Sequence, residues 1–414
     1  MKTTFKYITT VFITAMLFLA NGFAQETTSL QYYTVPGKAS LNQFEQPKTN
    51  TVAFNGLAVR IGGDFALQFQ GLTQTNSGDS LAELANNFTL PTANLNFDVQ
   101  LAPGMRMHLR TYLSSRHHTE AYVKGGYLRI DQLDFIEEGF LSELMEVLTI
   151  RVGMDQYNYG DTHFRRSDNA AAINNPFVGN YLMDSFSTEP FMEFTILKDG
   201  IIAVLGATNG RLNQKPTPGD DGMAFFGKLG YDSQVNEDLR VRITGSFYSS
   251  TDKGTRDYLY AGDRAGGRYY AIDDGRGDFS PRVSPGFPHQ TAFQINPFVK
   301  FQGLEFFGVF EVASNGADAG GSFTQLGAEV LYRLGVEEDF YVGGRYNAVS
   351  GEFSDAAPTY EVDRINIGGG WFLTDNVLTK LEYVKQTYGG DFTTGGSLLD
   401  GEFSGVMLEA VIAF

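Results

Sequence analysis

Apolar and polar residues alternate with a period of two over long stretches of this chain. From Leu57 to Phe69, apolar residues occupy nearly every second position, and polar or small residues lie between them. Successive side chains of a β-strand point to opposite faces, so the pattern predicts a strand with one apolar and one polar face. Such stretches run about 10 to 15 residues, whereas strands of soluble sandwiches usually have about 5 or 6. Their length favours strands that cross a membrane.

About sixteen such strands are predicted along the chain. They span roughly residues 57–72, 91–102, 104–114, 120–133, 147–153, 190–198, 200–209, 222–232, 239–250, 290–301, 303–314, 322–334, 337–349, 360–373, 376–388 and 402–414. Short and long connections alternate, as in an up-and-down barrel with tight periplasmic turns and long extracellular loops. One periplasmic connection is longer, because residues 140–147 are expected to form a short amphipathic helix. The predicted fold is an all-β, transmembrane antiparallel barrel, with fourteen or eighteen strands as alternatives.

The residues before the barrel divide into two predicted segments. Lys2 and Lys6 precede an apolar run over residues 8–20 and the small-residue site Gly22-Phe23-Ala24, which is typical of a secretory signal peptide cleaved after residue 24. The run is shorter than the roughly 20 residues that a membrane-spanning helix needs. Residues 25–56 are polar and weakly patterned, and we expect a flexible periplasmic lead-in. The barrel then covers residues 57–414.

Composition agrees with a membrane barrel. Hydrophobic residues make up only 42% of the chain, yet aromatic residues reach 14%, with 35 Phe and 21 Tyr. This combination suits strands with one lipid-facing side and aromatic girdles at their ends. The absence of cysteine excludes disulfides and thiolate metal sites. A formal charge of -17 argues against nucleic acid as a partner.

Position within each strand assigns the charged side chains to the lumen. The predicted pore-lining basic residues are Arg60, Arg106, His108, Arg110, Arg129, Arg151, Lys228, Arg240, Arg242 and Arg345. The predicted inward acids are Asp64, Asp98, Asp131, Glu193, Glu305, Glu311, Glu329, Glu382 and Glu409. An excess of basic side chains in a pore favours anions over cations. Alternatively, these basic residues pair with neighbouring acids in a structural network.

The third extracellular connection, residues 154–190, is long, aromatic and rich in hydrogen-bonding side chains. We expect it to fold into the barrel and narrow it. The candidate residues of this constriction are Asp161, His163, Arg165, Arg166 and Asp168. A cap that stays outside the lumen is the alternative.

The last ten residues, GVMLEAVIAF, resemble the closing strand of bacterial outer-membrane barrels. In those proteins such a strand is the recognition signal for the insertion machinery. The resemblance implies that Leu408, Ile412 and the terminal Phe414 form an assembly signal here.

Nearly the whole chain after the signal peptide resembles Gram-negative outer-membrane porins. Residues 92–113, 120–130 and 149–167 are weakly similar to the phosphate-selective, or polyphosphate and dicarboxylate, porin group. That resemblance implies a homotrimer with an arginine-lined path for small anions. The third connection departs from the group because it lacks a dense lysine cluster and offers only Arg165 and Arg166.

These features predict a porin in the outer membrane of a Gram-negative bacterium, exported through the periplasm. We expect passive diffusion of small anionic or neutral solutes, contact with outer-membrane lipid and the barrel assembly machinery, and a possible homotrimer. A non-conducting structural or adhesive barrel is the alternative. The five histidines lie in no catalytic or metal-binding motif, so neither an enzyme nor a cofactor is predicted.

Overall fold

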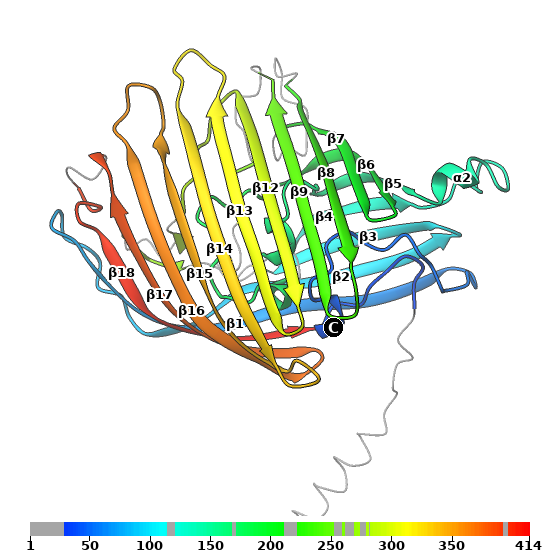
Figure 1. Cartoon of the computed structure of the whole chain (residues 1–414), viewed down its shortest axis with the longest axis horizontal. Coiled ribbons are helices and arrows are strands. Elements are labelled where there is room, and N and C mark those ends of the chain that lie inside the picture. The colour runs from blue at the N-terminus through cyan, green and yellow to red at the C-terminus, as the bar shows by residue number, and fades with distance from the viewer. Residues whose placement is uncertain are drawn as a thin grey trace, which may run out of the picture.

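The alternating stretches form the wall of a closed antiparallel β-barrel. The computed structural model describes residues 29–113, 121–167, 171–210, 222–251, 259–260, 269–273, 279–280, 282–391 and 396–414. Within these ranges sixteen strands pair around the barrel, which confirms the predicted fold class and strand number (Figure 1). They are β1 Ala58–Thr75, β2 Asn87–Ala102, β3 Met105–Leu113, β4 Ala121–Ile130, β5 Leu148–Gln156, β6 Thr188–Lys198, β7 Ile201–Thr208, β8 Ala224–Gln234, β9 Leu239–Ser250, β12 Gln290–Phe301, β13 Leu304–Asn315, β14 Ser322–Leu334, β15 Phe340–Glu352, β16 Tyr360–Thr374, β17 Val377–Gly389 and β18 Glu402–Ala413.

Strands β1 and β18 close the barrel. They pair in continuous antiparallel register from Asp64 opposite Ala413 to Thr75 opposite Glu402. The terminal residue Phe414 extends this seam, because its backbone exchanges hydrogen bonds of 2.9 and 3.0 Å with that of Gly63. Closure satisfies the backbone groups that an open sheet edge would expose to lipid.

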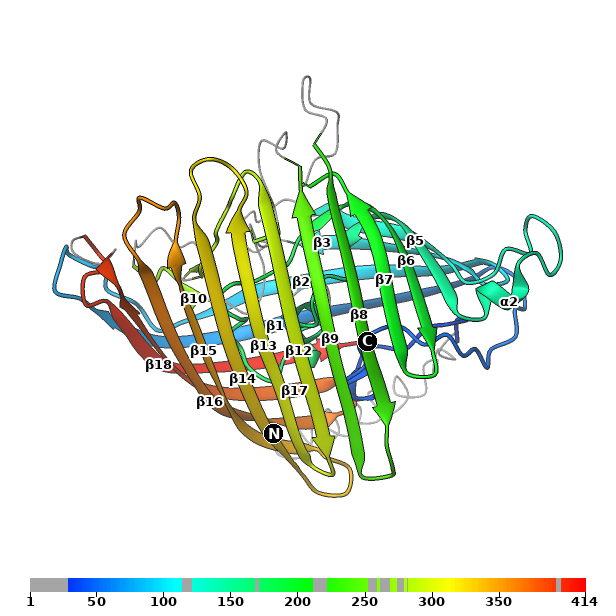
Figure 2. The same ribbon diagram turned by 45° about the horizontal axis from the view of Figure 1, so that its top comes forward.

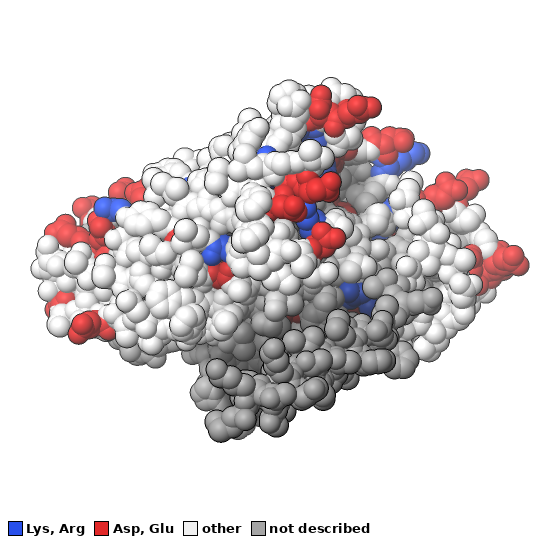
Figure 3. Space-filling model, turned by 90° about the horizontal axis from the view of Figure 1, so that it is seen from below, with Lys and Arg blue, Asp and Glu red and all other residues white. Residues whose placement is uncertain are grey.

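The outer face of the wall is apolar and the inner face is polar. On β1, Val59 and Ile61 are 44% and 50% exposed. Arg60, which lies between them, and Asp64, further along the strand, are buried. The closing strand shows the same division, with Leu408 and Phe414 outward. In the face seen in Figure 3, charged side chains occupy only part of the described surface. The exterior therefore matches the lipid-facing band of a membrane barrel.

Tight turns and long connections lie at opposite ends of the barrel (Figures 1 and 2). Two residues join β2 to β3, β6 to β7 and β12 to β13, whereas residues 157–187 join β5 to β6 and residues 251–289 join β9 to β12. The last connection contains β10 Tyr269–Tyr270 and β11 Phe279–Ser280, which pair as a separate two-stranded sheet. By analogy with other membrane barrels, the tight turns mark the periplasmic end.

The connection between β4 and β5 is the longer periplasmic one. It contains α2, Ser142–Met145, a single helical turn and so shorter than the helix predicted over residues 140–147. Leu141 and Leu144 are 50% and 44% exposed, and the turn projects from the side of the barrel (Figure 2). No helix in the described ranges is long and apolar enough to cross a membrane.

Residues 29–56 do not form the flexible lead-in expected from the sequence; they lie across the periplasmic end of the barrel. Gln31 is hydrogen-bonded to Gln100 of β2. The short helix η1, Lys38–Ser40, places the Lys38 amide 2.7 Å from the Asp375 carbonyl in the turn between β16 and β17. These contacts reach two parts of the wall that β1 and β18 separate, and they hold a segment that has almost no regular structure of its own.

The third connection and the long connection after β9 meet inside the barrel. The third connection contains the short helices η2, Thr162–Arg165, and η3, Ala172–Asn174. Its Leu182 and Met183 belong to a buried apolar cluster that also includes Tyr260 and Phe287 of the long connection. The interior therefore contains packed chain in addition to the inward side chains of the wall.

The β1–β18 seam should be sensitive to one added methyl group. Gly405 has φ +151, and a Cβ there would lie 2.2 Å from the Gly71 carbonyl oxygen. We expect Gly405→Ala to lower the free energy of unfolding by about 1–3 kcal/mol, in the range of other overpacked sites. Urea titration of refolded protein in lipid, followed by fluorescence of the single tryptophan Trp371, measures this change.

Gly245→Ala of β9 is the matched control, because the nearest atom to its Cβ lies 4.0 Å away. It should change the unfolding free energy by less than about 0.5 kcal/mol, as for a substitution that removes no contact. Equal effects of the two substitutions would contradict the close packing at the seam.

Candidate functional site

The structure places the predicted basic residues on the inner face of the wall. Arg60 extends from β1, Arg106, His108 and Arg110 from β3, Arg129 from β4, Arg151 from β5, Lys228 from β8, Arg240 and Arg242 from β9, and Arg345 from β15. All are buried except Arg151 and Arg240, which are partly exposed. Strand geometry accounts for this placement, because every second residue of a barrel strand must face the interior.

On strands β2 to β5 these basic groups are paired with carboxylates. Asp98 of β2 binds Arg106 at 2.5 Å and His108 at 2.9 Å. Arg110 lies 3.0 Å from an oxygen of Asp155, at the other side of β4. The pairs neutralise one another within the wall, which agrees with the structural network considered as an alternative to a bare arginine lining.

The same wall continues the pairing through Arg129 and Arg151. Arg129 donates to both oxygens of Asp131, at 2.6 and 3.1 Å. Arg151 lies 3.1 Å from Glu193 of β6. Buried charges need such partners, because an isolated ion in a medium of low polarity is strongly destabilised.

The third connection supplies further partners from inside the barrel. Arg165 of this loop and Arg345 of β15 both bind Glu329 of β14, at 2.6 Å each. Arg345 also donates to the Gly179 carbonyl oxygen at 2.6 Å. The loop and the wall therefore share one carboxylate between two guanidinium groups.

The predicted constriction residues that the structure describes are buried inside the barrel. Asp161 reaches the wall at β8 and β9, His163 packs against Phe164, and Arg166 pairs with Asp184 of the same loop at 2.7 Å. Asp168 lies outside the described residues. The described residues contact the wall and the inward segments, and their role in narrowing a passage remains a prediction.

Two wall carboxylates join the third connection to the long connection after β9. Glu311 of β13 accepts hydrogen bonds from Tyr159 at 3.1 Å and Tyr260 at 2.7 Å, one hydroxyl from each connection. Glu382 of β17 accepts one from Tyr269 at 2.7 Å and one from the Val178 amide at 2.8 Å. Both inward loops are thus held at two widely spaced points of the wall.

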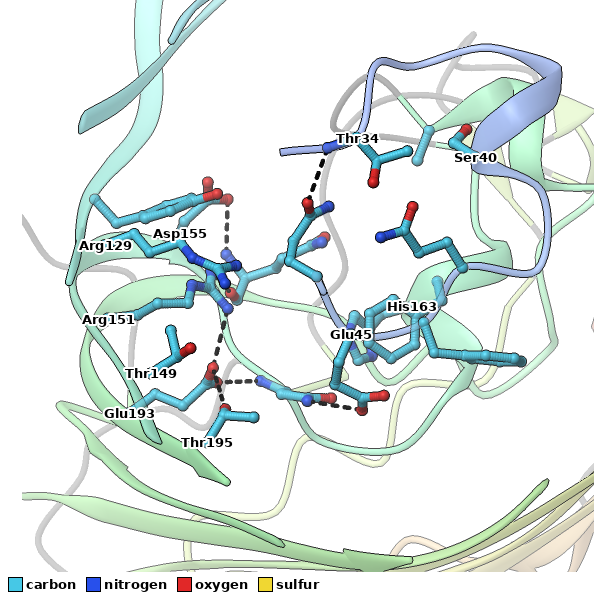
Figure 4. Close-up of a pocket in the computed structure, with 18 of the residues that line it drawn as sticks. Thr34, Ser40, Glu45, Arg129, Thr149, Arg151, Asp155, His163, Glu193 and Thr195 are labelled. Carbon is cyan, nitrogen blue, oxygen red and sulfur yellow. Dashed lines mark hydrogen bonds and ion pairs between the residues drawn. The ribbon is translucent and has the colours of Figure 1, made fainter. Parts of the chain in front are cut away.

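A cavity of about 220 Å³ lies between strands β3 to β6, the third connection and residues 34–46 (Figure 4). Arg129, Arg151 and Glu193 project into it from the wall, and Glu45 and His163 face it from the opposite side (Figure 4). Its surface combines guanidinium groups, carboxylates and aromatic rings. Such a lining is suited to small polar solutes and has no strong bias toward one sign of charge.

Burial and neighbouring charges determine the ionisation of groups on the segments inside the barrel. Burial by itself would raise the pKa of Glu45, but Arg242 and Lys228 outweigh it and lower the pKa to about 2. The same balance lowers the pKa of Asp161. Burial, reinforced by Lys228, lowers the pKa of His163 to about 3. Both carboxylates are therefore ionised and the imidazole is neutral at pH 7.

Several residues of this network were not identified from the sequence. Arg333 binds Glu305 at 2.5 Å. It lies four residues after the inward Glu329 on β14, so the alternation of the strand predicts that it also faces inward. Glu45 and Asn158 carry no such signal, because they lie outside the alternating strands. Within the described ranges, no group of three histidine or carboxylate side chains is arranged to hold a metal ion.

Solved outer-membrane structures share this fold at low sequence identity. Outer-membrane expressed OmpT of Vibrio cholerae matches with a TM-score of 0.53 and 9% identity, over 88% of this chain and 99% of that chain. An anion-selective porin from Comamonas acidovorans matches with a TM-score of 0.53 and 10% identity, over 86% of this chain and 100% of that chain. The outer membrane channel DcaP of Acinetobacter baumannii matches with a TM-score of 0.50 and 12% identity, over 87% of this chain and 99% of that chain.

No protein-family model and no curated protein matches the chain. The structural matches show the fold, a closed sixteen-stranded antiparallel barrel that outer-membrane proteins share. Together with the apolar outer face, this fold places the protein in the outer membrane of a Gram-negative bacterium.

Glu329→Gln tests the carboxylate shared by Arg165 and Arg345. Arg345 would remain buried without an ion-paired carboxylate, and Arg165 would keep only Glu305 at 3.6 Å, so we expect the free energy of unfolding to fall by about 3–5 kcal/mol. Urea titration followed by Trp371 fluorescence gives the value. The control is Glu402→Gln, which breaks the exposed pair with Lys385 at 2.8 Å and should cost no more than about 1 kcal/mol. A cost for Glu329→Gln as small as that of the control would contradict the assigned role.

Proposed function

We propose that this protein is a porin, a passive channel for small hydrophilic solutes. The observation that carries the proposal is the closed sixteen-stranded barrel with a charged and polar inner face. Eight strands already enclose a space that side chains can fill, and sixteen to eighteen leave room for an aqueous passage. The names of two fold neighbours, an anion-selective porin and a channel, support the same class.

We place the solute path on the side of strands β3 to β6. The cavity there is lined by Arg110, Arg151, Asp155 and Glu193, so a solute would remain in polar surroundings. Away from this side, Leu182 and other apolar side chains of the inward loops pack together. Water and polar solutes are expected to follow the charged wall, because an apolar constriction favours drying.

We propose that the preference for anions is weak. Arg110 and Arg151 face the cavity, but each has a carboxylate partner, Asp155 and Glu193. Paired charges largely cancel at a distance, and what remains is the set of guanidinium N–H donors that an anion can approach. Small anionic and neutral solutes are therefore both proposed cargo, and phosphate is not singled out.

Two further parts of the proposal concern assembly. The outward row of Leu408, Ile412 and Phe414 is available as a signal for the barrel assembly machinery. A homotrimer would follow the resemblance to porins. We propose no catalytic step and no cofactor.

A non-conducting barrel is the second candidate function. The observation in its favour is the packed interior, where Met183, Tyr260 and Phe287 belong to one apolar cluster. A barrel filled in this way would support surface attachment or envelope structure without passage of solutes.

Planar-bilayer recording under a KCl gradient distinguishes these two functions. We expect the refolded full chain to conduct, with a small reversal potential whose sign indicates a preference for anions over cations. Arg151→Gln removes one cavity-facing cation and should shift that potential toward cation preference. Lys385→Gln, on the outer face, should leave it unchanged.

A folded barrel that conducts no current would instead support the non-conducting candidate. Equal reversal potentials for wild type and Arg151→Gln would contradict the proposed path along β3 to β6.

A further inference from the structure

The segment before the barrel places a carboxylate in a cationic site of the wall. Glu45 accepts hydrogen bonds from both terminal nitrogens of Arg242, at 2.8 and 3.0 Å, through its two oxygens. Asn158 donates to it at 3.1 Å, and the ammonium of Lys228 lies 3.5 Å away. The two-pronged contact with arginine is the geometry in which this side chain recognises a carboxylate.

The two cations of this site are held by contacts in addition to those with Glu45. The side chains of Arg242 and Lys228 are 1% and 0% exposed, and both also bind Asp161, at 2.8 and 2.7 Å. Thr244 donates a further hydrogen bond to Asp161 at 2.8 Å. Because these groups fix one another, the two cations are held in position for a second carboxylate.

The net charge of the site changes from zero to positive when Glu45 is taken away. Three cations, Arg240, Arg242 and Lys228, face three carboxylates, Asp161, Asp232 and Glu45. Without Glu45, one cation is in excess, and Arg242 loses a bidentate partner. An anion of carboxylate geometry would restore both the charge balance and the hydrogen bonds.

The segment that carries Glu45 is attached by separate contacts and not by strand pairing. Phe44 packs edge-on against Phe164 and Phe298, with ring centroids 5.6 and 5.3 Å apart. Lys48 lies 3.0 Å from Asp131. Segments held by few regular hydrogen bonds open at lower free energy than the sheet beside them. Release of residues 29–56 therefore leaves the barrel wall intact.

We propose that Arg242, Lys228 and Asn158 form a binding site for the carboxylate group of a small solute, and that Glu45 occupies it as a built-in ligand. In this state residues 29–56 act as an autoinhibitory plug at the periplasmic end. A solute carboxylate that replaces Glu45 releases the plug. The second part rests on the proposed porin function, whereas the binding site stands independently of conduction.

Propionate binding to purified full-length barrel tests the site directly. Isothermal titration should show at least about tenfold tighter binding to Glu45→Ala than to wild type, because the variant removes the internal competitor and leaves Arg242 without the carboxylate that both its terminal nitrogens contact. Glu337→Ala, an exposed carboxylate of the turn between β14 and β15, is the matched control and should bind as wild type does. Neutral propionamide should bind none of these proteins.

Glu45→Gln provides a second variant if Glu45→Ala refolds poorly, since it keeps the shape of the side chain and removes its charge. Equal propionate affinities of wild type and the Glu45 variants, or no binding to either variant, would overturn the site. If the Glu45 variants gained equal affinity for propionate and propionamide, the site would also be overturned, because the gain would then not depend on the carboxylate charge.

A cross-link tests the plug. Ser40 and Asn174 are hydrogen-bonded at 3.1 Å, and the chain has no cysteine, so Ser40→Cys with Asn174→Cys introduces the only thiols. A short bis-thiosulfonate reagent should lower the single-channel current at least about tenfold when it ties the segment down, and reductant should restore it. Each single cysteine variant, treated in the same way, should keep the wild-type current.

The outcomes separate the two ideas. A current unchanged by the cross-link would overturn the plug and leave the porin intact. No current from any variant, including Glu45→Ala, would overturn the porin and with it the plug, while the propionate titration still decides the carboxylate site.

Discussion

The burial of guanidinium groups is the constraint on which the interior of this barrel depends. A strand wall turns every second side chain inward, and here many of those side chains are arginines. Each described pair, from Arg106 with Asp98 to Arg345 with Glu329, satisfies a charge that would otherwise be buried alone. The acids come from the wall, from the third connection and from the segment before β1. Pairing therefore decides where the inward segments lie as well as how the wall is stabilised.

The fold was predictable because its pattern is local. A period of two specifies both the strand and the face, so strands such as β1 and the inward position of Arg110 follow from a few neighbouring residues. The partners of those residues were not predictable. Asp155 could be placed only once β5 was set in register, and Glu45 lies in a stretch with no periodicity. Contacts between segments far apart in the chain depend on geometry that no local pattern contains.

Under the proposed function, the filled barrel and a conducting barrel are two states of one architecture. The wall alone encloses a wide space, and the inward loops are fastened to it by polar contacts such as those of Glu311 and Glu382. The paired charges make this interior hydrophilic without giving it a strong field. Solute selection would then depend more on hydrogen-bonding geometry than on net charge.

The unequal lengths of the strands have a consequence for the surrounding lipid. Strand β1 has 18 residues, whereas β7 has 8 and β5 has 9. At about 3.3 Å per residue and a tilt of about 40°, eight residues rise only roughly 20 Å along the membrane normal, less than the usual apolar band of about 25 Å. The bilayer must become thinner along this flank than along the opposite one. The barrel thereby imposes a gradient of membrane thickness, and lipids with shorter acyl chains should gather beside β5 to β7.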